Sequence, residues 1–334
     1  STIMFLENRI LMSYIFSLPE KSASIYFFLF LFVFASCSNY GETKNHTVDT
    51  PIKGQIIIGA DESFAPIVNL EISTFSNIYP DTKINVNYKP EAEVLVDFIN
   101  NKFPVVISTR KLNEEEVKYF KQIREAPYQI RMGTDAVAFI VNTSNPDSNL
   151  SHSQLLNILS GKISDWKSIS SASSLDNIVL VFDNTKSSTI RYIKEDVLKG
   201  NEFTKAAYAV DSSSAIIKYV EDNPNSIGVI SVNRISNSTD SLSQSFLKRI
   251  KVMGISNPDS ANQKVFYRPY RKYMLYRQYP FLRDLYLLNR EGHIGLGTGF
   301  ATYMISEEGQ LIIHHAGLVA AKQPVRVIEL RNEF

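Results

Sequence analysis

The chain has 334 residues, of which 44% are hydrophobic and 21% are charged, and its formal net charge at pH 7 is +1. That length accommodates two domains of ordinary size. The near balance of charge excludes a nucleic-acid partner that is held mainly by electrostatics, and it leaves small-molecule functions open.

The beginning of the chain has the pattern of an export signal. Residues 25–34 (IYFFLFLFVF) are apolar; Lys21 precedes them, and the letters ASC follow, ending at Cys37. A run this short is typical of a signal-peptide core, because a membrane-spanning helix needs roughly 20 apolar residues. Small residues directly before a cysteine are typical of the bacterial lipobox, so we predict a signal peptide with a lipobox at residues 1–36 and a lipid on Cys37. The alternative is a buried structural cysteine. Cys37 is the only cysteine of the chain, so an internal disulfide is excluded.

Residues 37–52 are polar, have no apolar period, and are predicted to be a flexible tether. With a lipid on Cys37, everything after it lies outside the cytoplasm. We therefore expect an exported bacterial lipoprotein, anchored to a membrane and facing the periplasm or the cell surface. Met12 is a more natural start than Ser1, so residues 1–20 are interpreted as upstream sequence or an extended n-region.

Apolar periodicity and capping residues predict regular elements along the rest of the chain. In the first part we predict strands at residues 53–59, 83–88 and 105–108, and helices at 65–78, 91–101 and 113–124. In the middle we predict strands at 137–142, 178–182 and 227–231, helices at 151–159, 188–198, 201–209 and 214–221, and a serine-rich loop at 236–245. In the tail we predict helices at 279–289 and 299–316 and a last strand at 325–330. Strands that alternate with helices at this rhythm indicate an α/β fold with largely parallel sheets.

One strand-to-helix junction has the composition of an anion site. The buried strand at residues 178–182 leads through a polar turn into a helix that begins with Ser187, Ser188 and Thr189 and carries Arg191 in its first turn. Hydroxyls and free N–H groups at a helix start can hold an anion. The alternative is that these three residues only cap the helix.

Other patterns give little support for different chemistry. Residues 264–283 interleave basic residues with tyrosines, which we interpret as a β segment with a cationic wet face, or as a protein contact, rather than as a nucleic-acid site. The glycine-rich stretch at 295–299 lacks a preceding strand, and we expect it to open a helix. His314 and His315 have no clustered acidic or cysteine partners, so no metal site is predicted. No nucleophile–base pair stands out, and we expect neither an enzyme nor a cofactor.

Several stretches occur together in an order that resembles one known family. They are GADESFAPI, VVISTRKLNEEE, VAFIVNTSNP, LLNILSGKISDW, NTKSST, SIGVIS and GFATYMISEEGQLIIHHAGL. Together they resemble the phosphate-binding protein family of ABC importers, over roughly residues 55 to 330. The most specific of them are the GKISDW segment and the last one, GFATYMISEEGQLIIHHAGL.

The resemblance implies a two-lobed type II periplasmic-binding-protein fold, with mixed, mostly parallel sheets and helices on both faces. Lobe 1 is expected at residues 53–130 plus 250–334, and lobe 2 at residues 131–249. The chain is expected to cross between the lobes near residues 126–134 and again near 231–250.

The resemblance also implies the ligand residues. They are Ser63 and Phe64 after the first strand, Ser108, Thr109 and Arg110 after the third, and Ser187, Ser188 and Thr189 at the helix start. Neutral N–H and O–H donors of this kind can surround a desolvated oxyanion without a large excess of basic residues.

Three departures from the family pattern bear on the ligand. The aspartate that the family places shortly before the third-strand serine, where it accepts the proton of hydrogen phosphate, corresponds to Pro104. The family's arginine before the helix start corresponds to Asp183, which reverses the charge. Asp61 and Glu62 add further negative charge near the first loop, where it repels an anion.

We therefore expect a lipid-anchored solute-binding protein that captures phosphate or a related oxyanion between two lobes. It is expected to be a monomer, to deliver its cargo to the membrane subunits of an ABC importer, and to bind no nucleic acid. The alternative is a degenerate binding-protein fold that acts as an envelope adaptor or assembly module without small-molecule cargo.

Overall fold

The computed structural model describes residues 49–236 and 241–323. The predicted signal peptide, Cys37 and nearly all of the tether lie outside the described residues, as does the strand predicted at 325–330. Among the described residues, no helix combines the length and the apolar character that crossing a bilayer requires.

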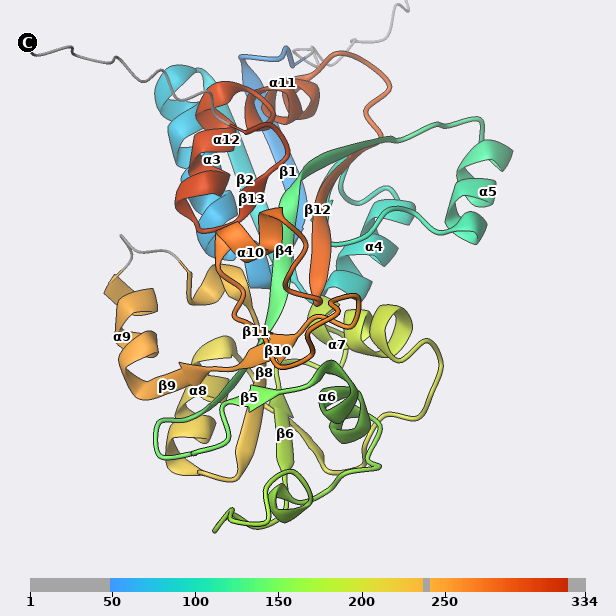
Figure 1. The fold of residues 1–334 in the computed structure, drawn as a ribbon. Helices are drawn as coiled ribbons and strands as arrows, with labels where there is room; N and C mark the ends of the chain where they lie inside the picture. The colour runs from blue at the N-terminus through green and yellow to red at the C-terminus, as the bar shows by residue number, and fades with distance from the viewer. Residues whose placement is uncertain (1–48, 237–240, 324–334) are drawn as a thin grey trace, which may run out of the picture. The chain divides into compact units, whose positions relative to one another are not determined.

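A mixed sheet organises the described residues, and its strand order is β2-β1-β3-β12-β4-β8-β6-β7, with β13 and β9 also pairing with β4 (Figure 1). The pairs β1·β2, β1·β3, β6·β7 and β6·β8 are parallel, whereas every pair made by β4 or β12 is antiparallel. The bounds are β1 Gly54–Asp61, β2 Thr82–Lys89, β3 Val105–Ser108, β4 Tyr128–Asn142, β6 Val179–Phe182, β7 Ala207–Ala209, β8 Ser226–Ser231, β9 Ile250–Val252, β12 Leu282–Asn289 and β13 Val319–Ala320.

Strand β4 joins the two halves of this sheet. Its beginning pairs with β12 and β13, and its end pairs with β8 and β9. Residues 136–141 are completely buried, as expected of a central strand that is covered on both faces. We call β1, β2, β3, β12 and β13 with their helices the first half, and β6, β7, β8 and β9 with theirs the second half.

Helices cover both faces of each half (Figure 1). In the first half they are α3 Ala65–Ile78, α4 Glu91–Ile99, α5 Glu114–Gln122, α11 Leu296–Met304 and α12 Glu307–His315. In the second half they are α6 His152–Leu159, α7 Ser188–Tyr192, α8 Ser213–Asp222 and α9 Ser241–Arg249. A small sheet of β5 Asn149–Leu150, β10 Gly254–Ser256 and β11 Phe266–Tyr267, and helix α10 Arg271–Leu275, complete the described strands and α-helices.

Many predicted elements are confirmed with nearly the predicted bounds. Helix α3 spans the predicted residues 65–78 and has a proline at its start. Helix α5 has the predicted capping box, in which Asn113 accepts from the N–H of Glu116 while the Glu116 side chain bonds back to Asn113. The mixed α/β class is confirmed as well.

Two predicted helices are wrong, because β7 takes up the end of one segment and β12 takes up most of the other. Residues 207–209 of the helix predicted at 201–209 form β7, which pairs with β6 at the edge of the sheet. Residues 282–289 of the helix predicted at 279–289 form β12, which lies between β3 and β4 and buries Leu285, Leu287 and Leu288. In both segments, strand pairing overrides a local sequence that is compatible with a helix.

Other boundaries shift. The helix predicted at 299–316 divides into α11 and α12, and α9 begins at Ser241 within the predicted loop. The predicted helix at 188–198 is α7 followed by a π-helical turn, Ile193–Val197. Strand β9 pairs with residues 140–142 of β4, and β10 pairs with β5, so residues 250–255 still lie against the part of the chain that follows the middle of β4.

Candidate functional site

The predicted ligand residues follow the carboxyl ends of parallel strands from both halves. Ser63 follows β1, Ser108 ends β3, and Ser188 follows β6. In open α/β sheets the carboxyl ends of the strands are the usual place for a ligand. All three side chains are buried.

One buried cluster joins the two halves through Glu91, the first residue of α4. Its Oε1 accepts from the N–H of Thr109 at 2.5 Å, from Thr109 Oγ1 at 2.7 Å and from Ser108 Oγ at 2.8 Å. Its Oε2 accepts from Arg191 Nε of α7 at 2.6 Å, and Arg191 Nη2 also donates to Thr109 Oγ1 at 3.1 Å. Thus Glu91 is held by two of the predicted ligand residues and by the arginine that the sequence singles out in the second half.

A second cluster surrounds Arg283 of β12, whose side chain is 1% exposed. Its Nε lies 2.9 Å from Asp135 Oδ2, and its Nη1 donates to Ser188 Oγ at 2.8 Å. The guanidinium carbon lies 5.4 Å from the centre of the Phe64 ring, at cation–π distance. Arg283 therefore contacts two of the predicted ligand residues, Phe64 from the first half and Ser188 from the second.

Several buried polar atoms next to these contacts have no hydrogen-bond partner among the described residues. The donors are Ser63 Oγ, Thr189 Oγ1 and Arg283 Nη2, and the acceptors are Asp61 Oδ2, Asp135 Oδ1 and Asp183 Oδ1. Buried polar atoms are nearly always hydrogen-bonded, to protein, water or ligand. These unpartnered atoms are the groups beside the two clusters that could hydrogen-bond to a ligand.

The acidic residues of the site have shifted pKa values. Burial raises the pKa of Asp61 to about 6, and the charge of Glu91 adds to that rise, while Arg283 and the Ser188 hydroxyl oppose it. Burial likewise raises the pKa of Asp183 to about 6, against the opposing effects of Ser187 and Arg283. Both carboxyls are thus neutral in moderately acidic solution and charged above about pH 6.

The remaining predicted ligand residues are engaged locally. The Ser187 hydroxyl accepts from the N–H of Ile190 at 3.3 Å, which is the capping role weighed as the alternative. Arg110 pairs with both oxygens of Glu116, at 2.7 and 2.8 Å. Arg110 therefore already has a bidentate carboxylate partner within the first half.

The sequence did not identify Glu91, Asp135 or Arg283 as site residues. Glu91 follows the end of β2 as Ser63 follows the end of β1, so its position after a parallel strand was the available signal. Arg283 was interpreted as part of a cationic wet face, whereas it is buried between β3 and β4. Only the strand pairing reveals that position.

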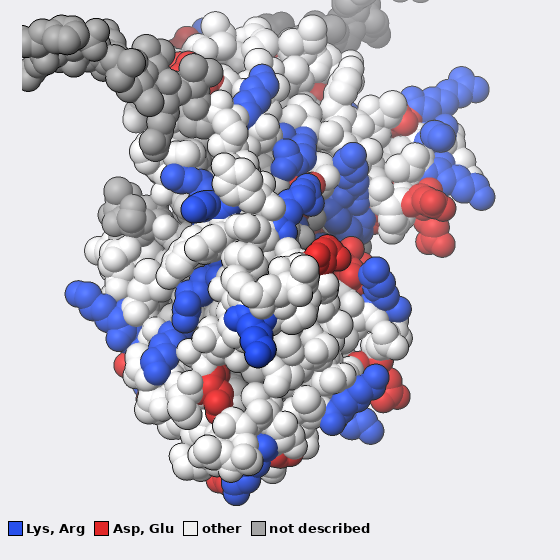
Figure 2. Space-filling model, in the orientation of Figure 1, with Lys and Arg blue, Asp and Glu red and all other residues white. Residues whose placement is uncertain are grey.

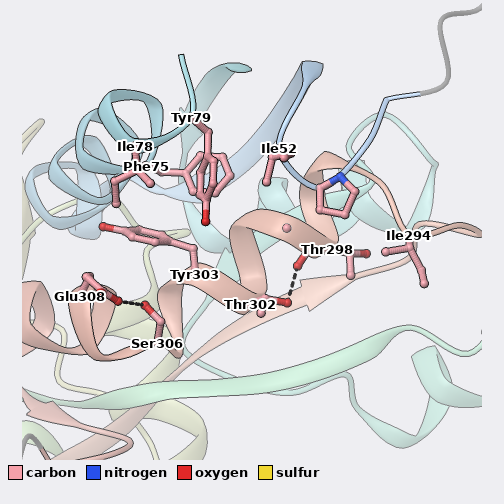
Figure 3. Close-up of a pocket in the computed structure, with 12 residues that line it drawn as sticks. Ile52, Phe75, Ile78, Tyr79, Ile294, Thr298, Thr302, Tyr303, Ser306 and Glu308 are labelled. Atoms are coloured by element: carbon pink, nitrogen blue, oxygen red, sulfur yellow. Dashed lines mark hydrogen bonds between the residues drawn. The ribbon is translucent and has the colours of Figure 1, made fainter. Parts of the chain in front are cut away.

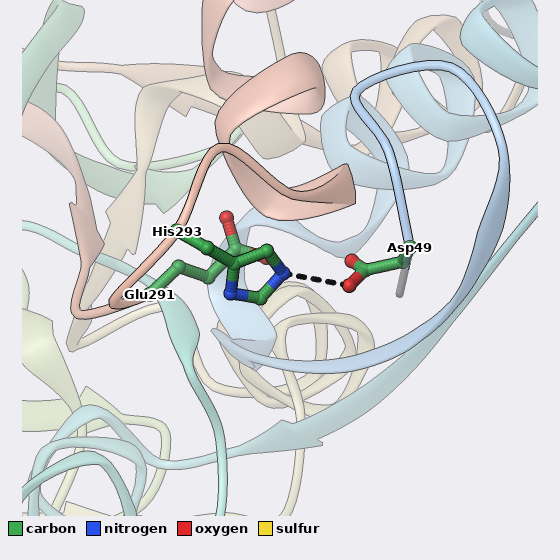
Figure 4. A group of neighbouring side chains, drawn as sticks. All are labelled: Asp49, Glu291 and His293. Carbon is green, nitrogen blue, oxygen red and sulfur yellow. Dashed lines mark hydrogen bonds and ion pairs between the residues drawn. The ribbon is translucent and has the colours of Figure 1, made fainter. Parts of the chain in front are cut away.

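A group that could hold a metal lies elsewhere, at the start of α11 (Figure 4). Asp49, Glu291 and His293 bring ligand atoms within 4.8 Å of one another, and His293 Nε2 lies 2.7 Å from Asp49 Oδ1. Their carboxylates already cap the helix, because Glu291 accepts from the N–H groups of Gly297 and Thr298 and Asp49 from that of Leu296. Capping accounts for this arrangement without a metal.

A cavity of about 430 Å³ lies among α3, α11 and α12 (Figure 3). Its walls are mainly apolar and include Phe75, Ile78, Tyr79 and Tyr303. None of the predicted ligand residues lines it. The cavity is therefore separate from the strand-end site.

Comparisons with known proteins bear on this fold. Residues 45–308 match the model of the PBP superfamily domain. A phosphate-binding protein PstS of Borreliella burgdorferi is 22% identical over 277 residues, which are 80% of this chain and 90% of that protein. One from Staphylococcus epidermidis is 24% identical over 274 residues, 81% of this chain and 80% of that protein.

Solved structures show the same fold. A putative phosphate ABC transporter substrate-binding protein from Clostridium perfringens, with bound phosphate, superposes with a TM-score of 0.65 at 22% identity, over 80% of this chain and all of that one. An ABC-type phosphate transport receptor from Vibrio cholerae gives a TM-score of 0.61 at 20% identity, also over 80% of this chain and all of that one. The resemblance drawn from the sequence, with its two-lobed fold, is therefore confirmed. This chain belongs to the PBP superfamily.

Proposed function

We propose that this chain is a lipid-anchored solute-binding protein that captures phosphate or a related oxyanion for an ABC importer. The two halves of the sheet act as its lobes, and the cargo lies between them at the strand ends. Relatives named phosphate-binding proteins support this function, and the leader sequence supports an anchor at Cys37.

The observation that carries the proposal is a set of unpartnered buried donors, on Arg283 itself and on the chain neighbours of two residues that contact it. Ser63 Oγ, Thr189 Oγ1 and Arg283 Nη2 lack partners among the described residues. Phe64 and Ser188, the chain neighbours of the two hydroxyl residues, both contact the Arg283 side chain. Two hydroxyls and a guanidinium nitrogen from both halves are suitable donors for the oxygens of an oxyanion.

Titration calorimetry tests the proposal directly. Ligand-free protein is titrated with inorganic phosphate, with sulfate and with an organic phosphate, at one pH and one ionic strength. We expect saturable binding of at least one of them. A flat trace for all three contradicts the proposed cargo.

The Thr189→Val variant tests the position of the site. Valine keeps the shape of threonine but removes the hydroxyl, so a bound oxyanion loses one donor in a buried setting, at a cost of about 1–3 kcal/mol. We expect phosphate affinity to fall at least tenfold, measured by the same calorimetry. The control is Thr143→Val in an exposed turn, which should leave the affinity unchanged. Equal affinities for Thr189→Val and wild type would move the site elsewhere.

The acidic side chains favour one other function, an envelope adaptor without small-molecule cargo. Asp61 and Asp183 add two buried carboxyls to the candidate site. Glu91 already accepts hydrogen bonds from Ser108, Thr109 and Arg191, so these donors are not open to an anion. The face that carries α10 is rich in Lys and Arg (Figure 2), and Tyr270 and Tyr276 are 60% and 66% exposed. Tyrosine and arginine are enriched at protein interfaces. Purification of the native protein from its envelope separates the two functions, because a stable complex with proteins other than a transporter supports the adaptor.

A further inference from the structure

Glu91 has the surroundings of a bound anion rather than those of a surface helix residue. It is 1% exposed although it is the first residue of α4. Its carboxylate accepts one backbone N–H, two hydroxyls and an arginine Nε, all within 2.8 Å. Charge-assisted hydrogen bonds of this length are the strong ones, and this is the donor set that proteins use for free oxyanions.

The protonation of Glu91 agrees with this description. Burial by itself raises the pKa of a carboxyl, but the charge of Arg191 and the hydrogen bonds from Thr109 outweigh burial and hold the pKa of Glu91 below its ordinary value. The side chain therefore carries a full negative charge at neutral pH. A second anion bound to the same donors would lie in contact with the charge of Glu91 and would be repelled by it.

We infer that Glu91 is an internal anion that occupies the Ser108–Thr109–Arg191 donor set, so that a free oxyanion must compete with it there. The inference rests on the proposed function, since it concerns the same strand-end site. Glu91 thereby determines specificity: it removes one arginine and two hydroxyls from the donors open to cargo. The donors left for cargo are Ser63 Oγ, Thr189 Oγ1 and Arg283 Nη2.

The same carboxylate joins the two halves of the sheet. Glu91 belongs to α4 of the first half and Arg191 to α7 of the second, and their side chains are 1% and 16% exposed. A second pair between the same helix and the turn before α7, Lys186 with Glu93 at 2.8 Å, is 60% and 42% exposed. Exposed ion pairs contribute little to stability. Of the two pairs, we therefore expect the buried one, Glu91 with Arg191, to have the larger effect on the contact between the halves.

The test compares Glu91→Ala and Glu91→Gln with the matched control Glu93→Gln. Glu93 lies on the same helix and also pairs with the second half, but its partner Lys186 is outside the buried donor set. Affinity for inorganic phosphate is measured by calorimetry on ligand-free protein. We expect Glu91→Ala to bind phosphate at least tenfold more tightly than wild type, Glu91→Gln to change in the same direction, and Glu93→Gln to stay within twofold.

A second measurement does not depend on phosphate. Formate is small enough to replace the missing carboxylate, so it should raise the melting temperature of Glu91→Ala in a saturable way and leave that of wild type unchanged. If Glu91→Ala does not fold, as judged by circular dichroism, Glu91→Gln decides the outcome, because it keeps the length of the side chain and removes its charge.

The outcomes separate the two proposals. Phosphate binding by Glu91→Ala or Glu91→Gln but not by wild type supports the internal anion and contradicts phosphate as the natural cargo. Phosphate binding by wild type that neither substitution tightens supports the cargo and overturns the internal anion. No binding by any of these proteins overturns both.

Discussion

Replacing Arg283 by methionine is expected to lower the free energy of unfolding by about 3–5 kcal/mol. The guanidinium is 1% exposed and is the ion-pair partner of Asp135, which is completely buried. Removing one member of a buried ion pair leaves the other charge uncompensated, and this cost exceeds what the pair itself contributes. Among the hydrogen bonds that the described residues make to the Asp135 side chain, only the one from the Ser231 hydroxyl to Oδ2, at 2.7 Å, would remain. Urea unfolding at pH 7 measures the loss.

Arg131→Met is the matched control for this variant. Arg131 lies on β4 and pairs with Asp284 of β12 at 2.9 Å, but the two side chains are 37% and 29% exposed. A pair with this exposure contributes about 0–1 kcal/mol. The double variant Arg283→Met/Asp135→Asn should recover part of the loss, since it removes the orphaned charge. If Arg283→Met and Arg131→Met lower the free energy of unfolding equally, the buried pair of Arg283 and Asp135 has no special role in the stability of the sheet.

The sequence predicted most of the elements that have strong local signals. Proline at the start of α3 and the capping box of α5 fix their beginnings through contacts within a few residues. Strands β7 and β12, at residues 207–209 and 282–289, have no such markers. Their strand character comes from pairing with β6, and with β3 and β4, which lie far away in the chain. Local propensity cannot supply that information.

The placement of the candidate site residues was predictable in part. The sequence predicted Ser63, Ser108 and Ser188 as ligand residues from their resemblance to the family, and the structure buries all three at strand ends. Their role as ligands stays a prediction. The sequence missed Glu91, because the contact with Arg191 joins residues 100 positions apart. The sequence around Glu91 does not indicate that an arginine lies beside it. A carboxylate at a helix start ordinarily counts as a favourable first-turn residue. Only the arrangement of the two halves shows that it occupies ligand-type donors.

A large pH-dependent effect is expected at Glu71, on the inner side of α3. The side chain is completely buried, and neither carboxyl oxygen has a hydrogen-bond partner among the described residues. Burial raises the pKa of Glu71 from 4.5 to about 9. In the folded protein this carboxyl is therefore neutral at pH 7, whereas in the unfolded chain it is ionised.

The sign of the effect follows from proton binding. Between pH 4.5 and about 9 the folded state holds one proton more than the unfolded state at this residue. The stability that Glu71 contributes is therefore fully present below pH 4.5 and is lost as the pH rises toward 9. Each pH unit in that window lowers the free energy of unfolding by up to about 1.4 kcal/mol. Glu71→Gln keeps the shape and cannot titrate. It should therefore be close to wild type at pH 5 and more stable by at least about 2 kcal/mol at pH 8.

Urea unfolding at both pH values measures this difference, and Glu115→Gln on the exposed side of α5 is the control that should leave the pH slope unchanged. Glu71→Met adds a second test, because it removes both unpartnered oxygens and should stabilise the protein even at pH 5. A wild-type slope equal to that of Glu71→Gln would mean that water or a partner reaches this carboxyl. Since α3 follows directly after the loop that carries Ser63 and Phe64, a proton-dependent α3 would also make the strand-end site less stable as the pH rises.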